Sequence, residues 1–254
     1  MAETYEALSE LAVSGGDLTF FQNFFVKFYQ AFIYNDRYLR YLEGVGTTIL
    51  VTAMALILGI LLGSIVALVR TAHDQQKSRK NLLLGVLNFI FRVYVTIIRG
   101  TPMMVQLLIM GMVVFSSSRN FTMVGTLTLG INSGAYVSEI IRGGLMAVDS
   151  GQMEAGRSLG LNYITTMLRI IIPQAIKAVL PALGNEFIIL LKDTSLITVI
   201  GGKELLYAAQ GIMNRTYEAM FPLLGTAVIY LILVMIFTWL LGIFERRLRQ
   251  SDRR

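Results

Sequence analysis

The sequence predicts an all-α integral membrane protein with about five transmembrane helices and an amphipathic helix near its N-terminus. Of its 254 residues, 55% are apolar and 15% are charged, whereas an average soluble domain carries roughly 25% charged residues. About 20 helical residues cross a hydrocarbon core of roughly 30 Å. Uncharged stretches of about this length occupy residues 44–69, 100–118, 120–138 and 219–244. This composition excludes a soluble globular enzyme, a disordered chain and a nucleic-acid-binding protein.

Five segments are expected to cross the membrane, so the two termini are expected on opposite faces. Their expected bounds are 43–69, 93–115, 121–147, 174–200 and 218–244. The apolar stretch 81–91 is too short to span a bilayer. We interpret it as an interfacial lead-in to the second span.

Glycine and proline positions indicate where the spans approach one another or break. Gly59 and Gly63 form a G-x-x-x-G pattern in the first span, which permits close helix approach. We interpret this pattern as ordinary helix packing rather than a subunit interface. Pro102 and Pro181 each remove a backbone donor, and both have a glycine nearby. They predict local unwinding in the second and fourth spans.

The Lys and Arg residues are unequally divided between the two sides of this arrangement. Fourteen flank the spans on one side and six on the other, while Arg99 and Lys192 lie inside or at the edge of spans. Because cytoplasmic loops carry an excess of Lys and Arg, the N-terminus is predicted outside and the C-terminus in the cytoplasm. Residues 248–254 are then a basic cytoplasmic tail, and the net charge of +6 reports topology.

Residues 1–40 are expected to form an extracytoplasmic segment that contains the amphipathic helix. Between Leu18 and Phe32, aromatic and apolar residues recur at spacings of three and four, which places them on one helical face. Asp17 or Ser14 could cap the start of this helix. We interpret the helix as an anchor in the outer interface or against the first span, rather than as a direct part of a transport path.

The sequence lacks the residues of several common catalytic sites. It has no cysteine and a single histidine, His73, so thiolate nucleophiles and Cys-based metal sites are excluded. The pair Gly202-Lys203 lacks the upstream glycine of a phosphate-binding loop. The chain therefore does not hydrolyse a nucleotide with a P-loop of its own.

A cytoplasmic segment at about 148–173, between the third and fourth spans, is expected to hold a short helix. Residues 152–159 favour a helix, Ser150 could cap its start and Gly160 could end it. A short helix that carries Leu159 can insert an apolar ridge into the groove of a partner. An ordinary amphipathic connector is the alternative.

This segment resembles the Glu-Ala-Ala loop of the membrane subunits of binding-protein-dependent ABC importers. The matching residues are Glu154, Ala155, Gly156, Leu159 and Gly160, where Gly156 replaces the second alanine of the family pattern. Three further stretches resemble the polar amino-acid branch of that family, which serves substrates such as histidine, glutamine and arginine. They read R-G-T-P-M-M-V-Q-L at 99–107, G-A-Y-V-S-E-I-I-R-G-G at 134–144 and L-K-D-T-S-L at 191–196. The resemblance covers about residues 41–247 as one transmembrane domain.

The resemblance implies a permease subunit in the cell membrane that catalyses no covalent chemistry. Two membrane subunits, identical or related, are expected to dock their cytoplasmic loops on two ATPase subunits. The ATPases bind ATP and Mg, so no cofactor or metal is expected in this chain. An extracytoplasmic substrate-binding protein is expected to deliver a polar amino acid, and lipid, but no nucleic acid, is an expected partner. The expected ATPase contacts are Glu154, Ala155, Gly156, Leu159 and Gly160.

Ionisable residues at bilayer depth cost roughly 2.5–3.5 kcal/mol on insertion scales and usually mark a pathway. Acidic groups could bind the ammonium of an amino acid, and cationic groups its carboxylate. Neutral side chains could add hydrogen bonds, and a methionine could form an adaptable wall. The predicted substrate-binding residues are Glu139, Asp193, Thr101, Gln106, Met104, Ser195 and Arg99.

A purely structural role for these charges stays open. Glu139 could pair with Arg142 at i, i+3, Lys192 could pair with Glu186, and Asp193 could cap a broken helix. Arg99 could lie at the cytoplasmic headgroups instead of in a pocket. For the function as a whole, the alternatives are an importer of another small zwitterionic or cationic solute, or an ion channel. A channel needs pore-lining polar rings and has no use for a loop that docks on an ATPase.

Overall fold

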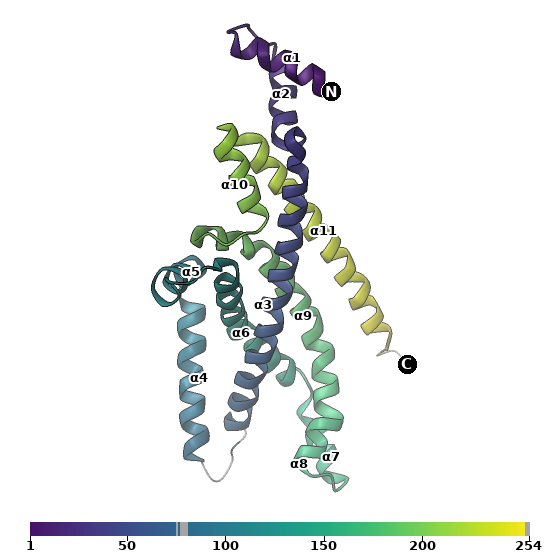
Figure 1. The fold of residues 1–254 in the computed structure, drawn as a ribbon. Helices are drawn as coiled ribbons and strands as arrows, with labels where there is room; N and C mark the ends of the chain where they lie inside the picture. The colour runs from purple at the N-terminus through teal and green to yellow at the C-terminus, as the bar shows by residue number, and fades with distance from the viewer. Residues whose placement is uncertain (75, 77–80, 252–254) are drawn as a thin grey trace.

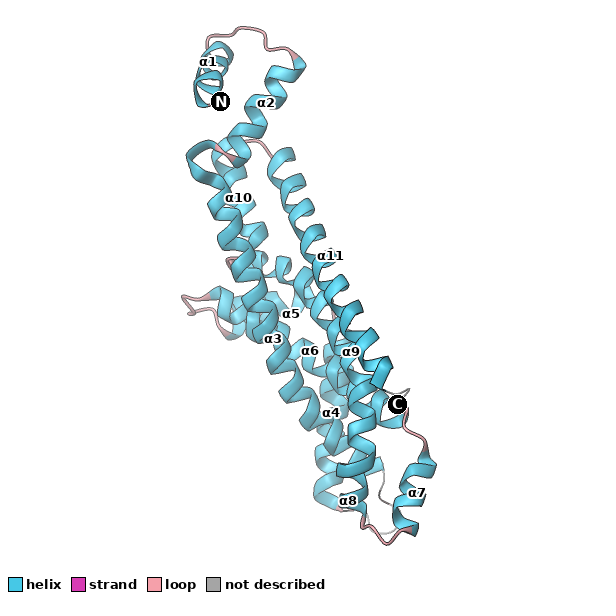
Figure 2. Ribbon diagram, turned by 90° about the vertical axis from the view of Figure 1, so that its right-hand side faces the viewer, coloured by secondary structure: helices cyan, strands magenta, loops and turns pink. Residues whose placement is uncertain are grey.

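The computed structural model describes residues 1–74, 76 and 81–251, and every regular element in these residues is a helix (Figures 1 and 2). The elements are, in order, α1 (Ala2–Val13), α2 (Phe20–Phe32), η1 (Tyr34–Asp36), α3 (Arg37–Asp74), α4 (Leu82–Gly100), α5 (Met103–Ile109), η2 (Met110–Val114), α6 (Phe121–Met146), α7 (Ser150–Ser158), α8 (Tyr163–Thr166), η3 (Met167–Ile171), α9 (Ile172–Asp193), η4 (Thr194–Ile200), α10 (Leu205–Thr216) and α11 (Met220–Ser251). The predicted all-α class is confirmed.

Within the described residues, four helical segments are long and apolar enough to cross a membrane. They are Tyr34–Asp74, Leu82–Gly100, Tyr163–Ile200 and Met220–Leu248. The predicted third span corresponds to α6, which has 26 residues but also carries threonines, serines and Glu139. Because α6 packs against both α3 and α9, these polar side chains are buried or half-buried within the protein.

The prediction for the second span is wrong in its position along the chain. The helix begins at Leu82, because the side chain of Asn81 accepts a hydrogen bond of 3.0 Å from the backbone N–H of Leu83. The segment 81–91 is therefore mostly part of the crossing helix and not an interfacial lead-in. The helix ends at Gly100, and Thr101 is extended, as expected for a residue before a proline. The seven residues of α5 follow as a separate helix.

The two predicted proline breaks have different outcomes. Pro102 lies at the gap between α4 and α5, so the predicted unwinding there is confirmed. Pro181 lies inside α9, which continues from Ile172 to Asp193, so the predicted unwinding there is wrong. A membrane helix tolerates an internal proline where neighbouring groups satisfy the freed carbonyl.

The close approach predicted at Gly59 and Gly63 occurs within the chain, between α3 and α6. A Cβ atom at Gly63 would lie 2.9 Å from the carbonyl oxygen of Gly134, and one at Gly59 would lie 2.7 Å from Ser133 Oγ. These glycines therefore let α6 lie directly on α3. The ordinary packing interpretation of the motif is confirmed.

The predicted aromatic helix near the N-terminus is α2, and it packs against the start of α11. The rings of Phe24 and Phe221 have their centroids 5.0 Å apart, and Lys27 Nζ lies 2.8 Å from Glu218 Oε2. The predicted caps were wrong, since the cap residue is Thr19. Its backbone N–H donates to Gln22 Oε1 at 2.9 Å, which gives this end the reciprocal partner that a capping box needs.

The molecule has two distinct ends (Figures 1 and 2). The short helices α7 and α8 lie at one end of the bundle, the end at which α3 ends and α4 begins. The helices α1, α2 and α10 lie at the other end. The loop that contains α7 therefore lies at the opposite end of the molecule from α10.

Candidate functional site: intramembrane polar groups and the α7 loop

Thr101 and Gln106 form one hydrogen-bonded group at the break between α4 and α5. Gln106 Nε2 lies 2.8 Å from the carbonyl oxygen of Ile98 and 2.9 Å from Thr101 Oγ1, and it donates to these acceptors. Asn132 Nδ2 of α6 donates to Gln106 Oε1 at 3.0 Å. The last carbonyls of a helix lack partners within the helix, so this amide closes the end of α4. A pocket of about 250 Å³ lies beside the break, lined by these two residues and otherwise mainly by apolar side chains.

Arg99 and Met104 flank the same break. Arg99 is the penultimate residue of α4, about 25 Å along the helix from Leu82. It therefore lies at the end of α4 that is remote from α7 and α8 (Figure 1). Its guanidinium carbon lies 5.2 Å from the ring centroid of Tyr136, a cation–π geometry. The side chain of Met104 is exposed.

Glu139 belongs to a charge cluster that ties α3 to α6. Its carboxylate is paired with Arg70 of α3, and its Oε2 lies 3.4 Å from Arg142 Nε. Arg142 Nη1 also lies 3.9 Å from Asp74 Oδ2. The pairing with Arg142 is the structural alternative that the sequence suggested, and it is present. Because two guanidinium groups already compensate Glu139, it is a poorer partner for a substrate ammonium than an unpaired carboxylate.

Two carboxylates lie on one side of α9, in the segment Tyr163–Ile200 that is long and apolar enough to cross a membrane. Glu186 is buried and accepts a hydrogen bond of 2.8 Å from Ser133 Oγ. Asp193 follows seven residues later, which places it two turns along the same helical face, about 10 Å away. Its carboxylate has no hydrogen-bond partner in the part of the chain that the structure describes. Together they are the best candidate for a substrate contact.

Two structural alternatives proposed for this region are wrong. Glu186 bonds to Ser133, and no ion pair joins it to Lys192 among the described residues. Asp193 precedes η4 but makes no side-chain cap bond to it. Ser195 uses its hydroxyl locally, donating to the carbonyl oxygen of Lys192 at 2.8 Å.

The predicted substrate residues therefore do not share one pocket. Gln106 and Thr101 lie at the α4 break, and Asp193 lies at the end of α9. Glu139 lies seven residues beyond Asn132, about 10 Å farther along α6 toward α7. We conclude that the break, the α9 carboxylates and the charge cluster are separate features.

The predicted cytoplasmic helix is α7, and it is well capped at both ends. Asp149 Oδ1 accepts a 2.7 Å hydrogen bond from the backbone N–H of Gly151. The predicted cap, Ser150, is instead the first helical residue. After α7, Gly160 has φ of +81°, a conformation that favours glycine, and Leu161 N donates to the carbonyl of Gly156 at 3.1 Å. Gly160 therefore ends the helix as predicted.

The residues of α7 divide into a buried and an exposed group. Gly156 is buried against α8, where an added Cβ would lie 2.5 Å from Thr166 Cγ2 and 2.9 Å from Thr166 Oγ1. Glu154 and Ala155 are exposed, and Leu159 is 81% exposed. The close contact explains why this sequence has glycine where the family pattern has a second alanine. It also leaves Gly156 as a packing residue rather than a surface contact.

Comparison with known proteins decides the family. A family model described as "Binding-protein-dependent transport system inner membrane component" matches residues 80–250. The chain belongs to this family. It is 35% identical over 229 residues to the putative glutamine transport system permease protein GlnP of Rickettsia typhi, which covers 89% of this chain and 97% of the relative. It is also 34% identical over 216 residues to the arginine transport system permease protein ArtQ of Bacillus subtilis, covering 83% and 93%.

The permease also resembles solved structures of ABC transporters. One titled "Crystal structure of an amino acid ABC transporter with histidines" has a TM-score of 0.73 and 40% identity, covering 82% of this chain and 94% of that one. An inward-facing MetNI methionine ABC transporter has a TM-score of 0.70 at 17% identity, covering 85% and 99%. The second likeness concerns the fold alone.

Sequence reasoning missed three groups in this permease. The sequence suggests Glu186 only as a partner of Lys192, although its position seven residues before Asp193 indicates a shared helical face. Arg70 lies 69 residues from Glu139, and no sequence spacing predicts such a pair. Asn132, which orients Gln106, carried no pattern that would have indicated its role.

Proposed function

We propose that this permease conducts a polar amino acid across the cell membrane as a membrane subunit of an ATP-driven importer. The observation that carries the proposal is the family membership together with relatives named for glutamine and arginine transport. The α9 carboxylates support the substrate class. Glu186 and Asp193 lie in a crossing segment, where acidic groups usually mark a pathway.

In this proposal Glu186 and Asp193 bind the cationic part of the substrate. The ammonium of any amino acid, or the guanidinium of arginine, would form charge-assisted hydrogen bonds with these carboxylates. Ser133 orients Glu186 through its hydrogen bond. The other predicted substrate residues would then lie beside the path without binding the cationic group; they are Thr101, Gln106, Met104, Ser195 and Arg99. Glu139 would hold α3 and α6 together.

The permease works with partners that hold the nucleotide. Two ATPase subunits would bind ATP and Mg, and a second membrane subunit, identical or related, would complete the path. An extracytoplasmic binding protein would deliver the amino acid. The assembly would alternate between an inward-facing and an outward-facing state. Because ATP makes different contacts in the two states, its binding and hydrolysis would shift the balance between them and so move the substrate path.

The loop that contains α7 is the proposed contact with the ATPase. Glu154, Ala155 and Leu159 form its exposed surface, and Leu159 supplies the apolar side chain that a groove can bury. Gly156 and Gly160 hold the shape of the loop. With this end in the cytoplasm, as the charge distribution predicts, α1, α2 and α10 lie outside. The N-terminus is then outside and the C-terminal tail cytoplasmic.

The first experiment tests the function itself. The permease is reconstituted in liposomes with its ATPase, membrane and binding-protein partners, and uptake of labelled glutamine and arginine is measured. Uptake that requires both ATP and the binding protein supports the proposal. Passive flux of sodium or potassium ions at a similar rate would instead indicate a channel. Uptake restricted to a solute that is not an amino acid would contradict the proposed substrate class.

The second experiment tests the α7 contact. Leu159→Ser removes an exposed apolar side chain, so we expect an approximately tenfold loss of co-purifying ATPase without a change in the thermal unfolding midpoint. Leu11→Ser makes the same kind of change at the opposite end of the molecule and serves as the control. Normal co-purification of the ATPase with Leu159→Ser would exclude Leu159 as an anchor of the contact.

A further inference from the structure

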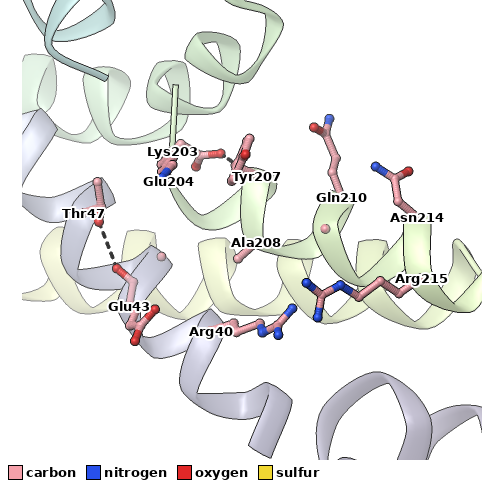
Figure 3. Close-up of a pocket in the computed structure, with 12 residues that line it drawn as sticks. Arg40, Glu43, Thr47, Lys203, Glu204, Tyr207, Ala208, Gln210, Asn214 and Arg215 are labelled. Carbon is pink, nitrogen blue, oxygen red and sulfur yellow. Dashed lines mark hydrogen bonds between the residues drawn. The ribbon is translucent and has the colours of Figure 1, made fainter. Parts of the chain in front are cut away.

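A polar pocket of about 480 Å³ lies at the end of the molecule opposite α7 (Figures 1 and 3). The first turns of α3 form one wall, and α10 with the residues just before it forms the other. A Cβ atom at Gly44 would lie 2.8 Å from the Cα atom of Leu205, so the two walls meet in direct backbone contact. The volume falls in the range of about 300–1,000 Å³ that small-molecule sites occupy.

Two guanidinium groups converge in this pocket without an acidic partner. Arg40 comes from α3 and Arg215 from the last turn of α10, and Figure 3 shows their side chains pointing toward one another. Neither has a carboxylate within 4.0 Å in the described part of the chain, whereas Lys27, Arg70 and Arg142 each do. Two adjacent guanidinium groups repel each other. A carboxylate between them would relieve this repulsion and accept bidentate hydrogen bonds.

The remaining charges make the pocket suitable for a zwitterion. Glu43 lies one turn from Arg40, is exposed, and has no ion pair among the described residues, so it can receive an ammonium. Lys203, Gln210 and Asn214 also line the pocket and carry further hydrogen-bond donors.

Glu204 is not available to a ligand, although it also borders this pocket. Its side chain is buried, accepts a hydrogen bond of 3.0 Å from the backbone N–H of Tyr207, and is bonded by the hydroxyl of Tyr230. Thr48 Oγ1 lies 3.4 Å from Glu204 Oε2. These bonds fix α10 against α3 and α11, so the pocket has a rigid floor.

The pocket lies beyond the hydrocarbon core. Arg40 and Arg70 are 30 residues apart on the same helix, a distance of about 45 Å, while the hydrocarbon core is roughly 30 Å thick. Since Arg70 belongs to the charge cluster near the α7 end, Arg40 lies outside the opposite surface of the core. In the proposed orientation, this is the side from which substrate arrives.

We propose that this pocket is an outer binding site for a free amino acid, whose α-carboxylate is held by Arg40 and Arg215 and whose ammonium faces Glu43. The proposal rests on the proposed function, because that function supplies the substrate class and the side of arrival. The site is separate from the α9 carboxylates. An acidic side chain of the binding protein offers the same carboxylate chemistry, and the experiment distinguishes the two sources.

The absence of cysteine from the sequence allows a specific test in the assembled transporter. Asn214→Cys places a single thiol at the pocket, and its rate of modification by a neutral maleimide is measured with and without L-arginine or L-glutamine. We expect each amino acid to slow the reaction at least threefold. L-argininamide, in which the carboxylate is replaced by an amide, should not slow it. Ser117→Cys, outside the pocket, should be insensitive to all of these compounds.

The arginines are tested in the same background. Arg40→Gln and Arg215→Gln should each abolish the protection, whereas Arg119→Gln, with the same change of charge outside the pocket, should preserve it. Glu186→Gln with Asp193→Asn should also preserve it, which separates this site from the proposed path. Gln210→Cys provides a second reporter if Asn214→Cys does not assemble.

Two results would overturn the proposal. One is an unchanged rate of modification in the presence of amino acid. The other is protection that only the binding protein provides, which would make the pocket a docking site for an acidic side chain. Either result leaves the uptake experiment unaffected, so a failure here is distinguishable from a failure of the proposed function.

Discussion

The hydroxyl of Ser133 in α6 donates a 2.8 Å hydrogen bond to the buried carboxylate of Glu186 in α9. We expect Ser133→Ala to lower the stability by roughly 1–3 kcal/mol, because it leaves one oxygen of a buried carboxylate unpaired. Thermal unfolding in detergent measures this loss. Ser138→Ala is the control, since its hydroxyl bonds only to the carbonyl of Ala135 in its own helix. Equal unfolding midpoints for both variants would mean that the α6–α9 bond contributes little.

Gly156 determines how closely α7 lies on α8. Gly156→Ala would place its new Cβ 2.5 Å from Thr166 Cγ2, so α7 must shift and we expect ATP-driven uptake to fall several-fold. Adding Thr166→Ala removes the clashing methyl group and should restore most of the uptake. If the double variant transports no better than Gly156→Ala alone, the packing explanation is wrong.

The cluster around Glu139 is expected to stabilise the fold rather than bind substrate. Glu139→Gln leaves Arg70 and Arg142 without their shared carboxylate, and we expect a loss of roughly 1–3 kcal/mol in a partly buried setting. A double-mutant cycle with Arg70→Gln measures the coupling. The apparent KM for amino-acid uptake should stay within about twofold of wild type. A tenfold rise in KM with unchanged stability would return Glu139 to the substrate path.

The ion pair between α2 and α11 should make the stability depend on pH. The hydrogen bond from Lys27 lowers the pKa of Glu218 below its ordinary value of 4.5. A carboxyl with a lowered pKa in the folded state stabilises above the unfolded pKa and loses this contribution as the pH falls through the folded pKa. The stability difference between wild type and Glu218→Gln should therefore be constant near pH 7 and shrink below pH 4.5. A difference that grows on acidification would contradict this assignment.

How much the sequence could predict depended on whether the determining interaction was local. The long uncharged runs predicted α3 and α11, because the length of an apolar run depends only on that stretch of sequence. Gly160 predicted the end of α7, because the φ that favours glycine is a property of that one residue. The predicted bounds of the second span, 93–115, were wrong because the extended residue before Pro102 ends α4 at Gly100. The pairs Arg70–Glu139 and Ser133–Glu186 join distant segments and follow only from the packing of α6 against α3 and α9.

The glycine pattern shows the same limit. Gly59 and Gly63 predicted that another helix approaches α3, but not that the helix is α6 of the same chain. Similarly, the resemblance predicted α7 as a docking loop, whereas the inward position of Gly156 emerged from the contact with Thr166.

Whether the α9 carboxylates lie on the substrate path is decided by ATP-driven uptake through the double variant Glu186→Gln and Asp193→Asn. It is measured in liposomes with all partners present, beside ATP hydrolysis stimulated by the binding protein. We expect at least a tenfold loss of labelled arginine and glutamine uptake in a variant that still assembles and hydrolyses ATP. Uptake at the wild-type rate, with the wild-type KM, would contradict the claim that the α9 carboxylates lie on the substrate path.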